Sequence, residues 1–440
     1  ATHTIDTVHR AAELGVNASV NGIDFGTLRD YRLRVVKTMV GGLAGLLAHR
    51  GITVFRANAA FHADEIAPAT SNHIVHLVPS PDQSDILTYH KADVPEPSGP
   101  TMDLTATNIV IATGAKPHPL PGNPFAGALI DSTQALEVNE FPSSAVIIGA
   151  GAIALEFASM WNAAGSKVTL LIRKDRVLSA WDRRAGTTLT RELKRHGVNI
   201  ITRASVTHVD TGANLGATVH YTREGQDGEQ SVWGEIALVA IGRDPITDPA
   251  WGVTIDDHGH VATDAYGRTD KPGVWAVGDV TAGHALAHRA FEQGIVIAET
   301  IAGLNPKPVD EATVPQIVFS FPEAASVGLT VEQAQAREDL IEIKETNYPM
   351  LANARMLMSG TAGSLTIVSG CDAANPDTPR VLGVHMVSQM ASDIIAEAEQ
   401  LVGNHVPLAD AARLVHPHPT FSETLGEALL KADGRPLHTR

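Results

Sequence analysis

The segment AVIIGAGAIALE, residues 145–156, decides how this 440-residue chain folds. Its four apolar letters predict a short buried strand, and the glycines that follow predict a tight turn. Helical spacing then continues to Gly165, and the run Lys167–Ile172 predicts a second strand. Strand, loop, helix and strand in this order are the setting in which GxGxxA spacing indicates a dinucleotide-binding unit.

Three small residues of this segment have separate tasks in such a unit. Gly149 permits the tight turn, Gly151 lets the backbone approach a pyrophosphate, and Ala154 is small enough for the helix to pack on the strand. The pyrophosphate would lie at the helix N-terminus, where free N–H groups and the helix dipole favour anions. The alternative is a tight turn between strand and helix that binds nothing.

The end of the second strand indicates which nicotinamide cofactor fits. An NAD site usually has an acidic residue there, which binds the ribose 2′-hydroxyl. This chain has Arg173 and Lys174 instead, and Asp175 comes too late to take that place. Two cations would attract a 2′-phosphate, so this position favours NADP, unless the cations only solvate the strand end.

Composition excludes several classes of protein. At about 150 residues per domain, 440 residues predict roughly three domains. Hydrophobic residues make up 44% and charged residues 19%, which excludes a disordered chain. The net charge of −16, without a long basic run, argues against a nucleic-acid or anionic-membrane partner. The most apolar region, residues 145–161, is interrupted by Glu156, so we expect no transmembrane helix.

The single cysteine, Cys371, excludes an intrachain disulfide and suits a reducing compartment, so we expect a cytoplasmic protein. The rest of the chain alternates strands and helices, with Pro117, Pro119 and Pro121 in a linker. Three glycines in the predicted helix Leu28–Ala48 (Gly41, Gly42 and Gly45) indicate close backbone packing. Antiparallel strands follow between residues 52 and 104, and an α+β region follows residue 308.

The segment HPHPTFSE, residues 416–423, carries a second candidate site. A histidine titrates near neutrality, and a nearby carboxylate orients it and raises its pKa, which suits acid–base chemistry. His418 and Glu423 could form such a pair. Alternatively, Thr420 and Glu423 form a capping box at a helix start. His416 and His418 lack a third ligand at useful spacing, so no metal is expected.

Many motifs in a fixed order resemble the flavoprotein disulfide reductases, and among them the dihydrolipoamide dehydrogenase branch. The resemblance runs from the first helix nearly to the last residue. Besides residues 145–156, the motifs are GGLAGLL at 41–47, ATG at 112–114, AIGRDP at 240–245, AVGD at 276–279, LAH at 286–288, VPQIVF at 314–319, FPE at 321–323, VG at 327–328 and HPT at 418–420 with Glu423.

This resemblance implies an α/β fold with two Rossmann-like dinucleotide-binding domains, one inserted in the other, and a C-terminal α+β dimerisation domain. Residues 1–117 would belong to the FAD-binding domain, 118–243 to the NAD(P)-binding domain, 244–312 to the returning FAD-binding or central domain, and 313–440 to the dimerisation domain. The protein would be a homodimer, with FAD and NAD, or NADP, as cofactors.

The resemblance also assigns site residues. His418 would take a proton from a dithiol substrate and reach the flavin and disulfide of the other subunit, with Glu423 orienting it. Asp279 would contact the FAD ribityl chain, with Gly278 allowing the approach, and Glu156 would lie beside the nicotinamide. The remaining cofactor-binding candidates are Gly149, Gly151, Ala154, Arg173, Gly242, Thr113, Gly114, Leu286, Ala287 and His288.

The implied activity is oxidation of a dithiol, on a small molecule or on a lipoyl domain of a 2-oxoacid dehydrogenase complex. Electrons would pass through an active-site disulfide and FAD to NAD+.

Two features depart from the family. Ile172-Arg173 resembles the NADPH-selecting arrangement, although the second arginine of that pattern falls on Ser179. The first FAD loop and the CxxxxC pair are absent, and Cys371 cannot replace them. We therefore expect a truncation of about 40–50 residues, with weak FAD binding and no activity for the 440 residues alone. The alternatives are an NADPH-dependent disulfide reductase and a non-catalytic dimeric scaffold.

Overall fold

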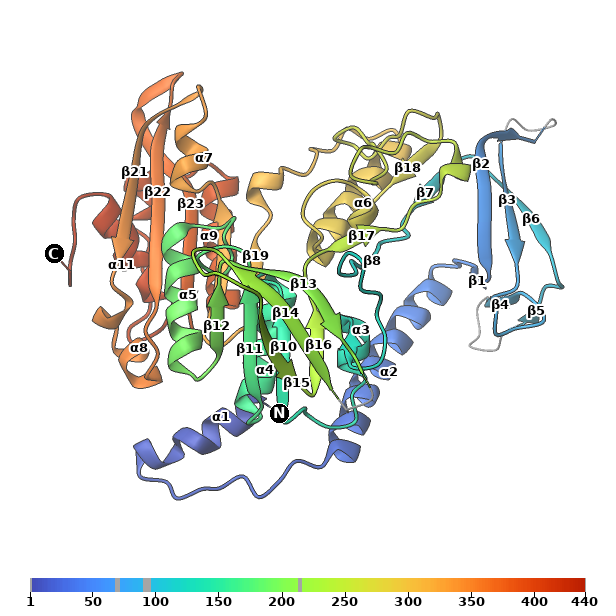
Figure 1. The fold of residues 1–440 in the computed structure, drawn as a ribbon. Helices are drawn as coiled ribbons and strands as arrows, with labels where there is room; N and C mark the ends of the chain where they lie inside the picture. The colour runs from blue at the N-terminus through green and yellow to red at the C-terminus, as the bar shows by residue number, and fades with distance from the viewer. Residues whose placement is uncertain (1, 68–71, 90–95, 213–215, 440) are drawn as a thin grey trace. The chain divides into compact units, whose positions relative to one another are not determined.

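The computed structural model describes residues 2–67, 72–89, 96–212 and 216–439 (Figure 1). The chain forms two compact units. The first comprises Ala1–Ser19, Pro117–Arg243 and Asp310–Arg440, and the second comprises Val20–Lys116 and Asp244–Val309. The three-domain division expected from the sequence stays a prediction.

A five-stranded parallel sheet organises the middle of the first unit. Its strand order is β12 (Asn199–Thr202), β11 (Lys167–Ile172), β10 (Ser144–Ile148), β16 (Ile236–Val239) and β9 (Leu129–Ile130). Helix α4 (Ala152–Ala163) connects β10 to β11, and α5 (Arg183–Arg195) connects β11 to β12. The predicted strand–loop–helix–strand unit is therefore confirmed.

Both faces of β10 are buried, which explains its unbroken apolar sequence. Ala145 and Ile147 belong to a core cluster with residues of α4 and α5. Val146 and Ile148 point to the opposite face, since side chains alternate along a strand. There they pack with residues of a second, antiparallel sheet, formed by β13 (Ala204–Asp210), β14 (Ala217–Arg223) and β15 (Gln230–Gly234).

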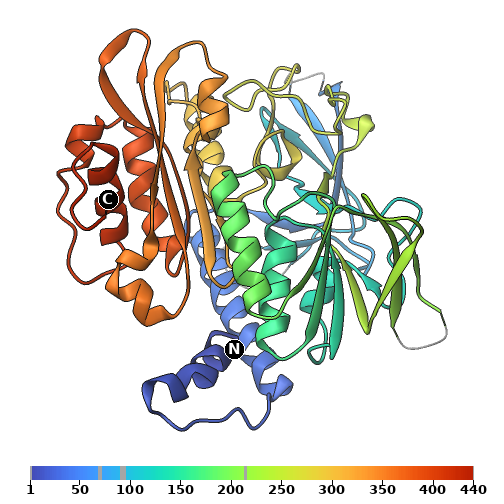
Figure 2. The ribbon, with the colours of Figure 1, turned by 60° about the vertical axis from the view of Figure 1, so that its left-hand side comes forward.

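The C-terminal part of the first unit is a five-stranded antiparallel sheet with helices. The strand order is β19 (Gln316–Val318), β20 (Glu323–Gly328), β23 (Asn375–Ser388), β22 (Ser364–Asp372) and β21 (Leu340–Tyr348). Its helices are α7 (Val331–Gln335), α8 (Ala354–Ser359), α9 (Ala391–Gly403), α10 (Leu408–Ala411) and α11 (Glu423–Ala432). The first eight residues of β22 are buried, because α9 and α11 cover one side of the sheet and α5 the other (Figure 2).

The first unit also includes the N-terminal helix α1 (Thr2–Arg10), which packs against α4. A 3-10 turn, Ala11–Leu14, ends at Gly15, which has φ +77°. The remaining elements of the chain are α3 (Ser132–Leu136), β8 (Ala115–Pro117), β17 (Arg243–Pro245) and the 3-10 turns Pro249–Trp251, Gly278–Val280, Glu311–Thr313 and Met350–Ala352.

The second unit is organised by two parallel strands, β7 (Ile109–Ile111) and β18 (Val274–Ala276). The antiparallel region expected before residue 104 is confirmed. It consists of β2 (Asn58–Ile66), β3 (His73–Val78) and β6 (Met102–Ala106), and of β1 (Val54–Arg56), β4 (Leu87–Tyr89) and β5 (Glu96–Pro97). Two long helices complete the unit, α2 (Phe25–His49) and α6 (Ala287–Ile301). None of the helices that the structure describes is long and apolar enough to cross a membrane.

One interpretation of helix α2 is wrong. The helix forms where expected, but its glycines do not mark close backbone packing. A Cβ added at Gly41, Gly42 or Gly45 would meet nothing within 4 Å among the described residues. No residue of α2, all of which are described, is buried. The three glycines therefore lie in a helix, as expected, but no described residue packs closely against their backbone.

Candidate functional site

The glycine loop after β10 combines one crowded position with one open position. Gly149 has φ +140°, and a Cβ there would collide with the carbonyl of Ala240. Gly151 precedes α4 as its N-cap, and a Cβ on it would meet nothing within 4 Å. Ala154 is fully buried in the first turns of α4. The loop therefore presents open backbone at a helix N-terminus, an arrangement that fits a pyrophosphate group.

Three of the predicted cofactor-binding residues gather at one edge of the parallel sheet. Gly149, Arg173 and Gly242 follow the carboxyl ends of β10, β11 and β16, which are neighbouring strands. From β10 the chain continues to β11 and β12 on one side of the sheet, whereas β16 lies on the other side of β10. The direction in which strands are added therefore reverses at β10. Ligands of open α/β sheets bind at such a switch point.

Arg173 is exposed at the end of β11, whereas the preceding Ile172 has only 1% of its surface exposed. Asp175 forms an ion pair with Arg176 at 3.2 Å, and Arg176 also donates to the carbonyl of Ser179 at 3.0 Å. Asp175 is thus engaged locally, which agrees with its unsuitability as a ribose ligand. Arg173 provides a positive charge in water where a 2′-phosphate would lie.

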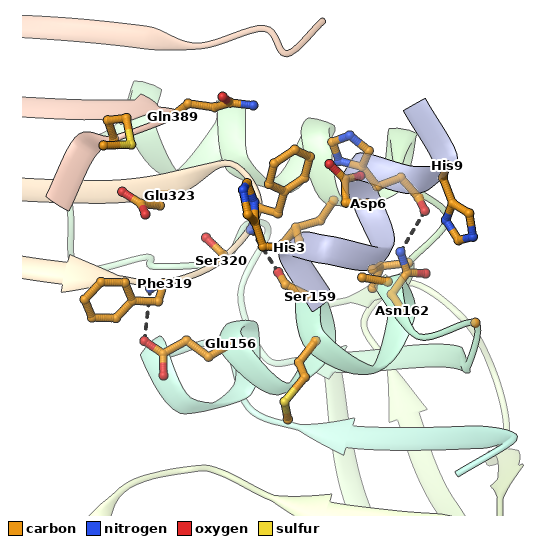
Figure 3. Close-up of a pocket in the computed structure, with 18 residues that line it drawn as sticks. His3, Asp6, His9, Glu156, Ser159, Asn162, Phe319, Ser320, Glu323 and Gln389 are labelled. Atoms are coloured by element: carbon orange, nitrogen blue, oxygen red, sulfur yellow. Dashed lines mark hydrogen bonds between the residues drawn. The ribbon is translucent and has the colours of Figure 1, made fainter. Parts of the chain in front are cut away.

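Glu156 lies on α4 at the edge of a cavity of about 440 Å³ (Figure 3). Its Oε1 accepts a hydrogen bond of 3.0 Å from the backbone N–H of Phe319. Burial raises the pKa of this carboxyl above its ordinary value, although that hydrogen bond lowers it. The cavity is also lined by His3, Asp6 and His9 of α1, which the sequence analysis did not identify.

The predicted cofactor-binding residues of the second unit also follow neighbouring strands. Thr113 and Gly114 come after β7, and Gly278 and Asp279 come after its parallel partner β18. Gly114 and Gly278 both have positive φ angles, +72° and +76°. The N–H of Gly278 donates to the side chain of Gln293 on α6 at 3.0 Å.

The predicted cofactor-binding residues 286–288 lie at the start of helix α6. Leu286 is its N-cap and is partly buried, while Ala287 and His288 are exposed. Helix α6 also packs against the turn Gly278–Val280. The second unit therefore brings its strand-end glycines and a helix N-terminus together, and backbone of this kind fits the close approach of a dinucleotide such as FAD.

His418 and Glu423 form a hydrogen-bonded pair in the first unit. The distance from His418 Nδ1 to Glu423 Oε2 is 2.7 Å, and 75% of the His418 side chain is exposed. A carboxylate only accepts hydrogen bonds, so Nδ1 carries the proton and a neutral ring presents the lone pair of Nε2. This is the geometry of an oriented general base with an accessible nitrogen.

Asn353 holds the carboxylate of this pair. Its amide donates to Glu423 Oε1 at 2.6 Å and to the carbonyl of Thr420 at 3.0 Å. Half of the alternative capping box also exists, because the N–H of Glu423 donates to Thr420 Oγ1 at 3.2 Å. The Glu423 side chain, however, bonds His418 and Asn353 rather than closing the box. Sequence could not reveal Asn353, which lies 70 residues away on a different element.

The surroundings of His416 and Cys371 indicate roles in packing rather than in catalysis. His416 Nε2 lies 2.8 Å from Glu397 Oε1, and this hydrogen bond raises the pKa of His416 despite partial burial. Cys371 is fully buried in β22, and burial raises the pKa of its thiol. A buried thiol of high pKa is a poor nucleophile.

Comparisons with known proteins identify the class. Residues 5–294 match the family described as pyridine nucleotide-disulphide oxidoreductase, and residues 314–429 match the dimerisation domain of that family. The chain therefore belongs to the pyridine nucleotide-disulphide oxidoreductases, whose cofactors are FAD and NAD(H), and it carries their dimerisation domain. The expected fold class and cofactors are confirmed, and the dimerisation domain supports a homodimer.

Particular relatives are dihydrolipoyl dehydrogenases. The one from Geobacillus stearothermophilus is 31% identical over 443 residues, covering 100% of this chain and 86% of the relative. The one from Cupriavidus necator is 37% identical over 341 residues, covering 76% of this chain and 70% of the relative. The crystal structure of LpdA from Mycobacterium tuberculosis has the same fold, with a TM-score of 0.82 over 98% of this chain and 87% of that chain at 23% identity.

Proposed function

We propose that this chain provides the nicotinamide-binding, flavin-contacting and dimerising parts of a dihydrolipoyl dehydrogenase, which oxidises a dithiol and passes the electrons to NAD+. The observation that carries this proposal is the 2.7 Å hydrogen bond between His418 and Glu423. It leaves Nε2 of an exposed ring free to accept a proton, within a chain whose relatives are dihydrolipoyl dehydrogenases.

In this proposal, His418 Nε2 takes the proton from one thiol of the substrate as the thiolate forms. The Glu423 carboxylate, held by Asn353, stabilises the resulting imidazolium through Nδ1. FAD, when bound, carries the electrons from the dithiol side to the nicotinamide side. The open backbone at Gly151 would hold the NAD pyrophosphate, with Glu156 beside the nicotinamide.

The redox-active disulfide has to come from cysteines outside these 440 residues, because the chain contains only Cys371 and a pair is required. The exposure of His418 agrees with a base that acts on the other subunit of the dimer. The dithiol would be dihydrolipoamide, free or on a lipoyl domain of a 2-oxoacid dehydrogenase complex.

The first test is the intact mass of the native protein and its thiol count after reduction and denaturation. A mass above 46.4 kDa with at least three thiols supports the proposal. A native protein with the single thiol of Cys371 contradicts it and favours a dimeric nucleotide-binding scaffold. If the thiols are present, dihydrolipoamide-dependent reduction of NAD+ should follow.

A second candidate rests on Arg173, which is exposed where the 2′-phosphate of NADP would lie. In that case the protein is an NADPH-dependent disulfide reductase of the same family. Initial rates with NADH and NADPH on the native protein distinguish the two, and Arg173→Glu provides the matched variant. A preference for NADPH that Arg173→Glu reverses would support this candidate.

A further inference from the structure

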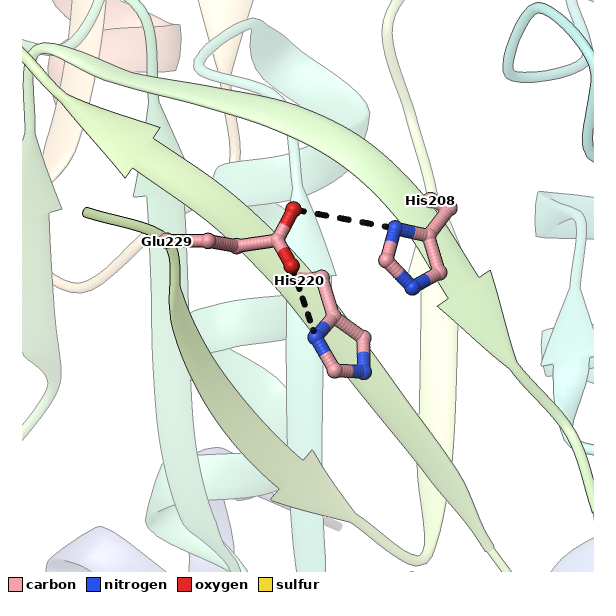
Figure 4. A group of neighbouring side chains, drawn as sticks. All are labelled: His208, His220 and Glu229. Atoms are coloured by element: carbon pink, nitrogen blue, oxygen red, sulfur yellow. Dashed lines mark ion pairs between the residues drawn. The ribbon is translucent and has the colours of Figure 1, made fainter.

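Two histidines lie face to face on the antiparallel sheet of the first unit (Figure 4). His208 of β13 is paired directly across from His220 of β14. Their rings are stacked, with centroids 4.1 Å apart and an interplanar angle of 8°. The side chains are 46% and 22% exposed, so solvent reaches both rings.

A β-bulge places His208 on the outer face. The register shifts between Val206 and His208, so Thr207 is an extra residue in β13. Val206 and Val209 can therefore both pack toward the core, while His208 and Asp210 point outward. Bulges re-aim side chains in this way and are common beside functional sites.

Two carboxylates flank the stacked rings. Glu229 Oε2 lies 3.6 Å from His220 Nδ1, and Glu229 Oε1 lies 3.8 Å from His208 Nδ1. On the other edge of the rings, Asp210 Oδ2 lies 3.1 Å from His220 Nε2 and 3.9 Å from His208 Nε2. Each ring thus has one nitrogen toward Glu229 and the other toward Asp210.

The hydrogen bond to Asp210 leaves Nδ1 of His220 as the ring nitrogen open to a metal ion. A carboxylate only accepts, so His220 Nε2 is the donor to Asp210. Nδ1 lies on the side of the ring that faces a carboxylate oxygen of Glu229. The hydroxyl of Thr207 donates to Glu229 at 2.7 Å, which holds the carboxylate in place. A metal cation between Nδ1 and this carboxylate would have both as ligands.

We propose that His208, His220 and Glu229 bind a transition-metal dication of the Zn²⁺ type. One ring nitrogen of each histidine and one oxygen of Glu229 all lie within 4.8 Å of one another. Tetrahedral Zn²⁺ places its ligand atoms about 3.3 Å apart, so the two exposed rings, which are parallel here, would turn their nitrogens toward one ion as it binds. Two imidazoles select Zn²⁺, Cu²⁺ or Ni²⁺ over Mg²⁺ and Ca²⁺.

Asp210 supports the same assignment. A histidine that binds a metal usually donates its other N–H to a carboxylate, which fixes the tautomer and orients the ring. Asp210 has this relation to His220. The bound ion would link all three strands of the sheet, since Glu229 directly precedes β15. Water would occupy the fourth position of the ion.

The test is zinc titration of the EDTA-treated native protein by calorimetry, with Mg²⁺ as a second titrant. We expect one zinc ion per chain to be lost in His208→Ala and in His220→Ala, and a tenfold to hundredfold weaker affinity in Asp210→Asn. His76→Ala is the matched control, because His76 also lies between two carboxylates, Asp103 and Glu65, but has no second histidine.

Two further measurements make the result decisive. The melting temperature of the wild type should rise with zinc, and that rise should disappear in His208→Ala and His220→Ala but persist in His76→Ala. Cu²⁺ bound to the wild type should show two imidazole nitrogens by electron paramagnetic resonance. Unchanged zinc stoichiometry and affinity in the double variant His208→Ala/His220→Ala would overturn the proposal, as would a wild type that binds Mg²⁺ equally well.

Discussion

His416 and His418 are two residues apart, and each pairs with a glutamate, but the burial of ring and carboxylate is reversed between the two pairs. His416 is only 9% exposed, and its partner Glu397 is 35% exposed. His418 is 75% exposed, and its partner Glu423 is 15% exposed. A Cβ added to Gly426 would collide with the His416 ring, so that ring is packed in place. A histidine–glutamate pair with a buried ring, as at His416, therefore holds its segment in place. A pair with a buried carboxylate, as at His418, leaves the imidazole exposed, where it can act as a base.

The largest expected effect is on turnover. His418→Gln removes the base and leaves the surroundings nearly unchanged, because the side chain is exposed. Dihydrolipoamide-dependent NAD+ reduction by the native flavoprotein should fall by about 10²- to 10⁴-fold, at an unchanged melting temperature. Wild-type turnover in this variant would show that His418 is not the base.

A substitution at Asn353 tests whether the Glu423 carboxylate sets the basicity of His418. Asn353→Asp keeps an oxygen for the N-cap of α8 but places a second carboxylate beside Glu423. Turnover should fall by about tenfold to hundredfold. The acidic limb of the pH–rate profile should move to higher pH, since extra negative charge favours the imidazolium.

The matched control is Asn347→Asp, because Asn347 also donates to a carboxylate, that of Glu345. It should leave the pH–rate profile in place. If both variants shift the profile equally, the effect comes from net charge and not from the His418 pair.

His416 should matter for stability rather than turnover. His416→Ala removes a packed ring and its hydrogen bond, and should lower the free energy of unfolding by about 1–2 kcal/mol. His418→Ala, at an exposed position, should change it by less than about 0.5 kcal/mol. Urea unfolding measures both values, and equal losses would remove the distinction drawn between the two pairs.

The smallest effect is a pH dependence of that stability. The pKa of folded His416 is raised by its hydrogen bond to Glu397. Its contribution is therefore fully present below the unfolded pKa of about 6.5 and is lost as the pH rises through the higher folded pKa. Because Glu397 is 35% exposed, solvent screening limits this contribution to less than about 1 kcal/mol. Glu397→Gln should abolish this component in urea unfolding between about pH 5.5 and 8.5.

The sequence predicted those parts of the fold that depend on residues close together in the chain. The spacing of Gly149, Gly151 and Ala154 predicted the loop, because each residue type is required by its own backbone geometry. Alternation of strands and helices also followed from the sequence, as in the antiparallel strands between residues 52 and 104. The interpretation of the glycines in α2 failed, since a glycine within a helix does not by itself show that a neighbour packs there.

The side-chain sites were less predictable because they depend on distant segments. The pairing of His418 with Glu423 is local and could be suspected, but Asn353 reaches it only through the fold. His208 and His220 lie across from each other because Thr207 bulges, which no local pattern of residue types indicates. His3 and Asp6 reach the cavity beside Glu156 because α1 packs on α4.

The burial of Cys371 has a practical consequence for spectroscopy. Within these 440 residues the only thiol is enclosed in β22, so labelling reagents should not modify it while the protein is folded. A cysteine introduced at an exposed position of each compact unit would therefore be labelled without interference from Cys371, once the redox pair proposed outside these residues is replaced. Pairs of spin labels placed in this way could measure the distance between the two units, and its change when a nucleotide binds, with Cys371 left in place.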